Sequence, residues 1–127
     1  MVTPHLSTSS HIDVEKGILK VTLENNGVGP AVIIDFEIHA NGNLVEGEDE
    51  VESALNLLLA ETPNTSWGHE SLTRNSFLPA GQKIELATIV NKVISPEKLI
   101  EILDPKFTLK IAYNSIYGEP FNFDSHD

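Results

Sequence analysis

The residues with the best chemistry for recognition lie close together, in the segment from Thr62 to Asn75. It contains the only tryptophan of the chain, Trp67, the only arginine, Arg74, and between them His69. Aromatic and guanidinium side chains are enriched among the residues that dominate protein interfaces. At 14 residues the segment is also the longest without hydrophobic periodicity, and loops of that length in a compact domain are usually functional or disordered. We therefore predict that Trp67, His69 and Arg74 carry the recognition of this domain.

Structural roles compete with this prediction at two of the three positions. A lone tryptophan commonly covers one end of a hydrophobic core, and Arg74 has 19 acidic side chains with which to pair. Both alternatives remain open at the level of the sequence. A buried ring would emit at shorter wavelength than an exposed one, because its surroundings are apolar.

No motif in the chain predicts catalysis, a metal or a cofactor. Two of the missing patterns are the Gly-x-Ser-x-Gly motif of hydrolases and a helical pair of histidines for zinc. The acidic run from Glu46 to Glu52 does not fit a calcium loop, and we interpret it as the solvated start of a helix. The pair Gly27 and Gly29 lacks the third glycine of a dinucleotide-binding loop. We therefore expect no enzyme, no metal site and no cofactor.

The net charge of −11 and the isoelectric point near 4.7 restrict the partners. An acidic field repels phosphate backbones and anionic lipids, so nucleic acid is not an expected ligand. No stretch approaches the roughly 20 apolar residues of a membrane span, so we expect no membrane insertion by this segment. The partner class that remains for a binding domain is another protein of unknown identity.

The hydrophobic pattern predicts an all-β domain. A chain of 127 residues suits one domain, which we place at residues 1–127. Alternation of apolar and polar residues predicts strands, and 3.6-residue periodicity predicts two short helices. The strands are expected at 18–24, 31–39, 43–45, 83–90, 107–114 and 121–123, and the helices at 49–60 and 96–103. The expected fold is an immunoglobulin-like antiparallel β-sandwich of about seven strands, with the two helices in the connections.

One turn is expected to be structural. Asn25, Gly27, Gly29 and Pro30 lie between the first two predicted strands. We predict that the glycines provide backbone angles that a Cβ atom would strain, and that Pro30 fixes the start of the next strand.

The same turn resembles the strand–turn–strand junction of the bacterial cell-adhesion-related domains, which are immunoglobulin-like sandwiches. Together with Leu78–Gly81 and Tyr113–Phe121, the chain from Gly17 to Phe123 is similar to a little-characterised bacterial family. This resemblance implies a domain outside the cytoplasm, anchored by an N-terminal membrane helix that is absent from this chain. Some of those relatives have cysteines where this chain has Ala112, Asn114 and Pro120, so a cysteine-based role is not expected here.

Two functions follow as hypotheses. The first is a non-catalytic binding or structural module that contacts another protein in the periplasm or at the cell envelope. The alternative is a small-ligand carrier or an enzyme that uses the segment from Trp67 to Arg74 as one wall of a pocket. Glu119, Pro120, Asp124 and Asp127 surround the last strand and disfavour edge-to-edge pairing, so we predict a monomer or a weak dimer.

Overall fold

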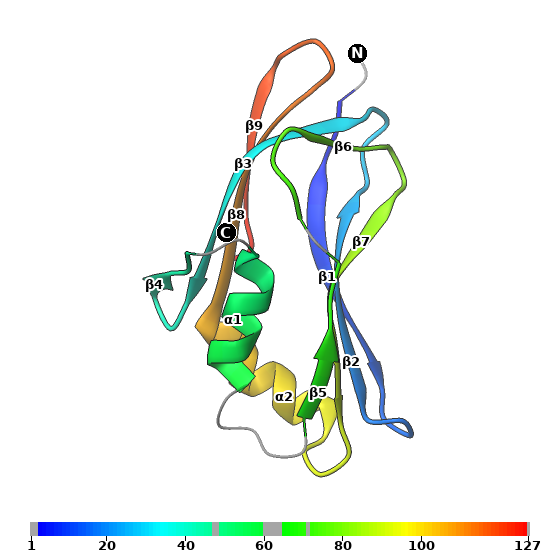
Figure 1. Cartoon of the computed structure of the whole chain (residues 1–127). Coiled ribbons are helices and arrows are strands. Elements are labelled where there is room, and N and C mark those ends of the chain that lie inside the picture. Colours follow the sequence, from blue (N-terminus) through cyan, green and yellow to red (C-terminus); the bar gives the residue numbers. More distant parts are fainter. Residues whose placement is uncertain (1–2, 47–48, 60–64, 71, 127) are drawn as a thin grey trace.

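Two antiparallel sheets face each other in the computed structural model, which describes residues 3–46, 49–59, 65–70 and 72–126 (Figure 1). The first sheet has the order β1-β2-β7-β5, and the second has the order β4-β3-β8-β9, with β6 pairing with β3. The strands of the first sheet are β1 (Leu6–Asp13), β2 (Ile18–Asn25), β7 (Lys83–Asn91) and β5 (Thr65–Gly68). Those of the second are β3 (Ala31–Ala40), β4 (Asn43–Leu44), β6 (Ser76–Leu78), β8 (Phe107–Asn114) and β9 (Pro120–Asp124).

The strand order confirms the predicted fold class. In immunoglobulin domains strands A, B, E and D form one sheet and strands C, F and G the other. Here β1, β2, β7 and β5 take the places of A, B, E and D, and β3, β8 and β9 take those of C, F and G. The core lies between the sheets and is aliphatic, with Leu19, Leu23, Ile38 and Leu109 all buried.

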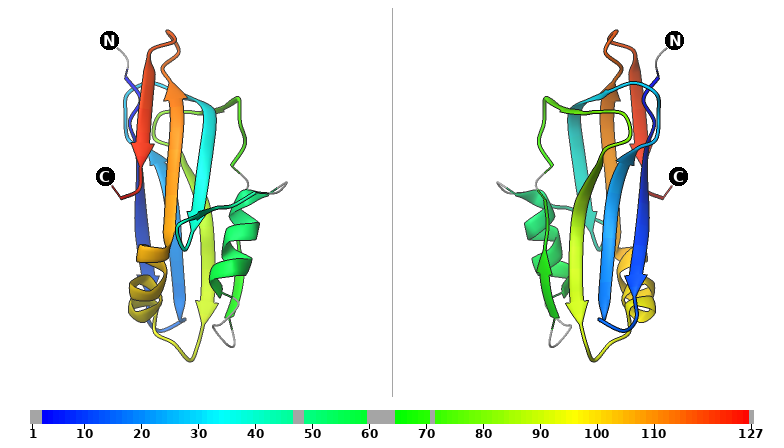
Figure 2. Two further views of the ribbon diagram at one scale, coloured as in Figure 1. Left: turned by 90° about the vertical axis from the view of Figure 1, so that its left-hand side faces the viewer. Right: turned by 90° about the vertical axis from the view of Figure 1, so that its right-hand side faces the viewer.

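Two helices occupy the connections, as predicted. Helix α1 (Glu50–Leu59) follows β4 and packs against β3, and α2 (Pro96–Leu103) follows β7 and packs against β1 and β2. Figure 2 shows α1 near β5 and α2 at the opposite edge of the sandwich. The Ser95 hydroxyl caps α2 by accepting a hydrogen bond from the Lys98 amide, and the short helix η1 (Asp104–Lys106) ends it.

The prediction of a 14-residue loop from Thr62 to Asn75 is wrong. Residues 65–68 form β5, which pairs with β7 and places Trp67 opposite Ile89. Residues 62–64 and 71 lie outside the described part of the chain. The strand escaped prediction because its four residues alternate between half-buried and exposed without an apolar pattern.

The sequence also missed β1 and β6, so the described residues form nine strands rather than about seven. β1 consists largely of serine, threonine and histidine, which carry no alternation of hydrophobic residues. It is nevertheless paired along its whole length with β2. β6 is a three-residue strand, too short to show a period.

A β-bulge divides the predicted buried face of β3, which is confirmed after the bulge and wrong before it. Val32, Ile34, Phe36 and Ile38 are expected to share one face, but the pairing with β8 shifts between Ile33 and Asp35. Before the bulge Ile33 is buried and Ile34 is exposed, whereas Phe36 and Ile38 are buried after it. The extra residue of a bulge changes the phase of the alternation, and the sequence pattern alone does not reveal it.

The turn after β2 is organised around the fully buried side chain of Asn25. Its Oδ1 accepts from the amides of His5 and Gly27, at 3.1 and 3.0 Å, and its Nδ2 donates to the carbonyls of Gly29 and Leu78, both at 2.9 Å. All four hydrogen-bonding positions of the carboxamide are therefore used, and the turn is tied to the N-terminal segment and to β6.

The predicted reason for Gly27 is wrong in detail. Its backbone does not have a positive φ, and neither does that of Gly29. Instead, a Cβ atom at Gly27 would lie 2.3 Å from the carbonyl oxygen of Thr3. The position requires glycine because another segment of backbone approaches it closely, not because of its own dihedral angles.

Candidate functional site

The start of α1 brings together several ionisable side chains from distant parts of the chain. Asp49 caps the helix, because its Oδ1 accepts from the Glu52 amide at 3.2 Å and its carbonyl accepts from the Ser53 amide at 3.0 Å. A carboxylate at this position also interacts favourably with the positive end of the helix dipole.

His69 of the segment after β5 completes this cluster. Its Nε2 lies 2.8 Å from Asp49 Oδ2, and the His69 side chain is only 14% exposed. The hydrogen bond with His69 lowers the pKa of Asp49 below its ordinary value, and the Glu52 amide contributes in the same direction, whereas burial opposes the shift. The Trp67 ring lies 6.1 Å from the His69 ring, is half-buried and packs against the core.

The same residues offer ligands for a cation. One ligand atom from each of Asp49, Glu52 and His69 lies within 4.8 Å of the other two. Imidazole and carboxylate groups together suit zinc and similar ions. Asp49 and His69 already satisfy each other and the helix start through hydrogen bonds, so the arrangement is explained without an ion.

Arg74 also contacts the start of α1, through Glu50. Its Nε donates to Asp35 Oδ1, and its Nη2 donates to Glu50 Oε2 at 2.8 Å and to the Phe36 carbonyl at 2.9 Å. The guanidinium carbon also lies 4.2 Å from the centroid of the Phe36 ring, in cation–π contact. Arg74 therefore forms the ion pairs that the sequence left open as an alternative, and it connects β3 with α1.

These contacts change the proton affinities of the paired groups. The hydrogen bond from Arg74 lowers the pKa of Asp35, with a smaller contribution from the Phe36 amide. In turn, the hydrogen bonds to Asp35 and Glu50 raise the pKa of Arg74. Both shifts favour the charged forms of Asp35 and Arg74.

An acidic pocket of about 350 Å³ surrounds this arginine. Four carboxylates line it, together with Arg74 and the apolar side chains of Phe36, Leu44 and Val45. The carboxylates belong to Asp35 and Glu37 of β3, Glu46 after β4, and Glu50 of α1. Four negative charges around one positive charge make the pocket suitable for a cationic group.

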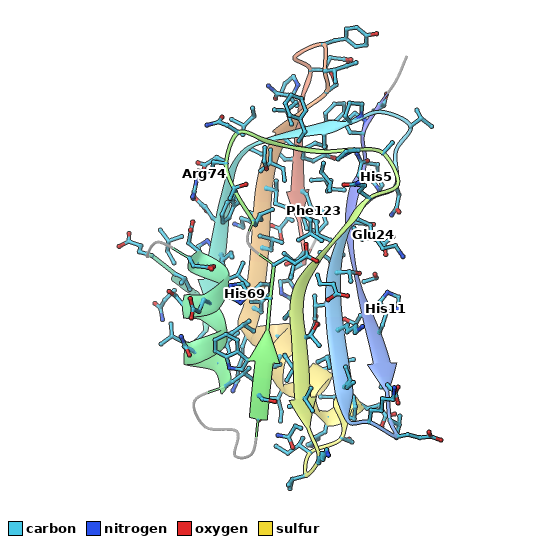
Figure 3. The ribbon with its side chains drawn as sticks, turned by 45° about the vertical axis from the view of Figure 1, so that its right-hand side comes forward. His5, His11, Glu24, His69, Arg74 and Phe123 are labelled. Atoms are coloured by element: carbon cyan, nitrogen blue, oxygen red, sulfur yellow. The ribbon has the colours of Figure 1, made fainter. Side chains whose placement is uncertain are left out.

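The structure thus separates the three predicted site residues. Arg74 lines the acidic pocket, whereas His69 binds Asp49 and Trp67 packs on the core nearby. Figure 3 shows His69 and Arg74 on the side of the molecule that carries α1. The sequence did not identify Asp35, Asp49 and Glu50 as their partners, because 39, 20 and 24 positions separate the members of each pair.

No helix among the described residues is long and apolar enough to cross a lipid bilayer. Comparison with protein-family models and with curated protein sequences gives no match for this chain. The site must therefore be interpreted from its own geometry and chemistry.

Proposed function

We propose that this domain is a non-catalytic binding module that contacts another protein at the cell envelope through a basic segment of that partner. The observation that carries the proposal is the acidic pocket around Arg74, lined by four carboxylates. A lysine or arginine side chain placed there would gain charge-assisted hydrogen bonds. The acidic surface of the whole domain, with a net charge of −11, would also steer a basic segment toward it.

The contacts within the pocket assign different roles to its carboxylates. Asp35 and Glu50 hold Arg74, so they build the wall. Glu37 lies at the surface, with its only ion-pair partner in the described residues, His39, at 3.3 Å. Glu46 follows the β3–β4 hairpin at the pocket rim. We assign Glu37 and Glu46 as the residues that meet the incoming cation.

The location at the cell envelope is part of the proposal and rests on the resemblance described for residues 17–123. It is tested by fractionating cells that express the complete gene product and detecting the domain by antibody. Recovery in the cytoplasmic fraction alone would contradict the location without affecting the binding site.

The binding site is tested with a fluorescein-labelled tetralysine peptide as the probe, followed by fluorescence anisotropy at low salt. We expect the double variant Glu37→Gln/Glu46→Gln to weaken binding by about fivefold, the magnitude of exposed charge pairs. The matched control is Glu97→Gln/Glu101→Gln on α2, which removes the same charge from a surface that does not line the pocket.

The two double variants distinguish a pocket from a diffuse field. Binding that weakens only in the pocket variant supports the proposal. Equal weakening in both variants, or equal binding of a labelled tetraglutamate peptide, would show that the pocket does not recognise cations and would overturn it.

A further inference from the structure

A second cavity, whose lining does not include Arg74, lies between the two sheets and has a different chemistry. Its volume is about 230 Å³, and most of its wall is aliphatic. The first sheet contributes Leu19, Leu86 and Ile89, and α1 contributes Leu55 and Leu58. Interiors of proteins are packed to near crystal density with few voids larger than a water molecule, so an apolar cavity of this size is unusual.

The two connecting helices explain why the cavity exists. An α-helix with its side chains is about 10 Å wide, which is close to the usual spacing of two packed sheets. α1 packs against β3, and α2 packs against β1 and β2, so helices stand in part of the space where two sheets would interdigitate (Figure 1). Side chains of both helices, including Leu55 and Leu103, form walls of the cavity but do not fill it.

The cavity has a polar rim at the edge of the sandwich between β1 and α2. Ser10 and Asp104 are exposed members of its lining, and Ser125 lies at the same cavity. No lysine, arginine or histidine is part of the lining. Within the described part of the chain, no basic side chain forms an ion pair with Asp104.

We propose that this cavity binds a small cationic amphiphile, with its apolar chain inside and its ammonium group beside Asp104. An apolar cavity of 150 Å³ holds benzene, so 230 Å³ has room for an apolar body of about nine non-hydrogen atoms. The oxygens of the Asp104 carboxylate accept hydrogen bonds, which favours a head group that donates them. Anionic amphiphiles are disfavoured because they would meet Asp104 and the negative field of the domain.

The cavity is not the pocket that the sequence suggested for a small-ligand carrier, which would have the segment from Trp67 to Arg74 as one wall. Neither Trp67 nor Arg74 lines the cavity, and the two pockets share no lining residue. Occupation of the cavity and binding of a basic peptide at Arg74 are therefore separate properties, and each can fail without the other.

The test compares three ligands that share an eight-carbon chain: octylammonium, octanol and octanoate. We expect octylammonium to bind, measured by isothermal titration calorimetry and by a concentration-dependent rise in Tm. It should bind about fivefold more tightly than octanol, because its ammonium group forms an ion pair with Asp104. The difference is no larger because Asp104 is exposed, and exposed ion pairs contribute little free energy. Octanoate should bind more weakly than octanol.

Two variants locate the site. Ala87→Phe places a ring in the cavity and should abolish binding, whereas Ala80→Phe adds the same bulk at an exposed turn and should not. Asp104→Asn should remove the preference for octylammonium over octanol. Glu101→Gln removes a charge from an exposed position on α2 that is not part of the lining and should leave the preference unchanged.

A measurement on the unmodified protein keeps the proposal testable if Ala87→Phe does not fold. Addition of octylammonium should shift the methyl NMR signals of Leu55, Ile89 and Leu103, while those of the exposed Leu57 and Val93, which line neither pocket, stay in place. The proposal is overturned if octylammonium does not bind, if octanoate binds as tightly, or if the methyl signals of the cavity do not move.

Discussion

At the residue scale, the pairing of Asp49 with His69 couples the start of α1 to the segment after β5. The pKa of Asp49 is lower in the folded chain than its ordinary value, mainly because of the hydrogen bond with His69. A carboxylate with a lowered folded pKa stabilises the fold at pH values above its unfolded pKa. This contribution disappears as the pH falls through the folded value.

The variant Asp49→Asn tests this coupling. Asparagine caps a helix about as well as aspartate, so the variant loses the charge and keeps the cap. We expect it to be less stable than the parent by about 0.5–1 kcal/mol at pH 6, and the difference to shrink toward zero as the pH falls below the unfolded pKa of aspartate, about 4. Urea unfolding at each pH gives the difference directly. Equal stability of the variant and the parent at pH 6 would show that Asp49 acts as a cap alone.

The buried side chain of Asn25 shows which features of a single residue can be predicted from the sequence and which cannot. The sequence predicts the turn, since asparagine and glycine favour turns. It does not predict the bonds to His5 and Leu78, because these depend on segments 20 and 53 positions away. The glycine at position 27 was assigned to the correct turn for the wrong physical reason, since the close approach of Thr3 exists only in the folded chain.

At the element scale, predictions succeeded where one face of an element is uniformly buried. Strand β8 alternates without interruption, with Leu109, Ile111 and Tyr113 all buried, and its pattern was read correctly. β3 was located correctly, but its bulge at Ile33–Asp35 reversed the face assigned to Ile34. The bulge also includes Asp35, which forms an ion pair with Arg74. The irregularity that the hydrophobic pattern does not predict therefore lies at the acidic pocket.

Strand β5 determines what Trp67 does. The ring packs against the core from a short edge strand and is half-buried. We expect Trp67→Ala to lower the free energy of unfolding by about 2 kcal/mol, less than the loss of a fully buried tryptophan, which is about 3–5 kcal/mol. Trp67→Phe should retain most of the stability, because a large aromatic ring remains. Urea unfolding followed by circular dichroism measures both variants.

The result for Trp67 also separates the two roles that the sequence left open. A ring that supports the core should be partly protected from acrylamide quenching in the folded protein. Unchanged stability in Trp67→Ala, together with full quenching, would instead make the ring available to a partner.

At the scale of the whole molecule, the fold class followed from the number of strands, but the functional surfaces did not. Alternating segments separated by turns are sufficient to favour a sandwich, since a sheet with one apolar face must bury it against another layer. The two pockets depend on which strands become neighbours and on where the helices lie between the sheets. Side chains from β1, β2, β7, α1 and α2 meet at the apolar cavity, and no spacing in the sequence brings them together.

The edges of the two sheets and the net charge together predict the association state. β9 and β1 are edge strands. Pro120 and Asp124 lie on β9, whereas β1 has eight residues with neither proline nor lysine. An unprotected edge favours pairing with a second chain, but a net charge of −11 on each copy opposes it at neutral pH. We therefore expect a monomer at pH 7.5 in low salt and association as the pH approaches the isoelectric point near 4.7.

Light scattering after size-exclusion chromatography at both pH values measures this balance, and one pair of variants identifies the edge. Ile12→Lys places a lysine at an exposed apolar position of β1 and should reduce association at acidic pH, because a charged side chain on an edge strand disfavours pairing. Leu57→Lys adds the same side chain at an exposed position on α1 and should reduce it less. Equal effects would assign the association to overall charge, and a stable dimer or tetramer at pH 7.5 would mean that an interface outweighs the repulsion between acidic copies.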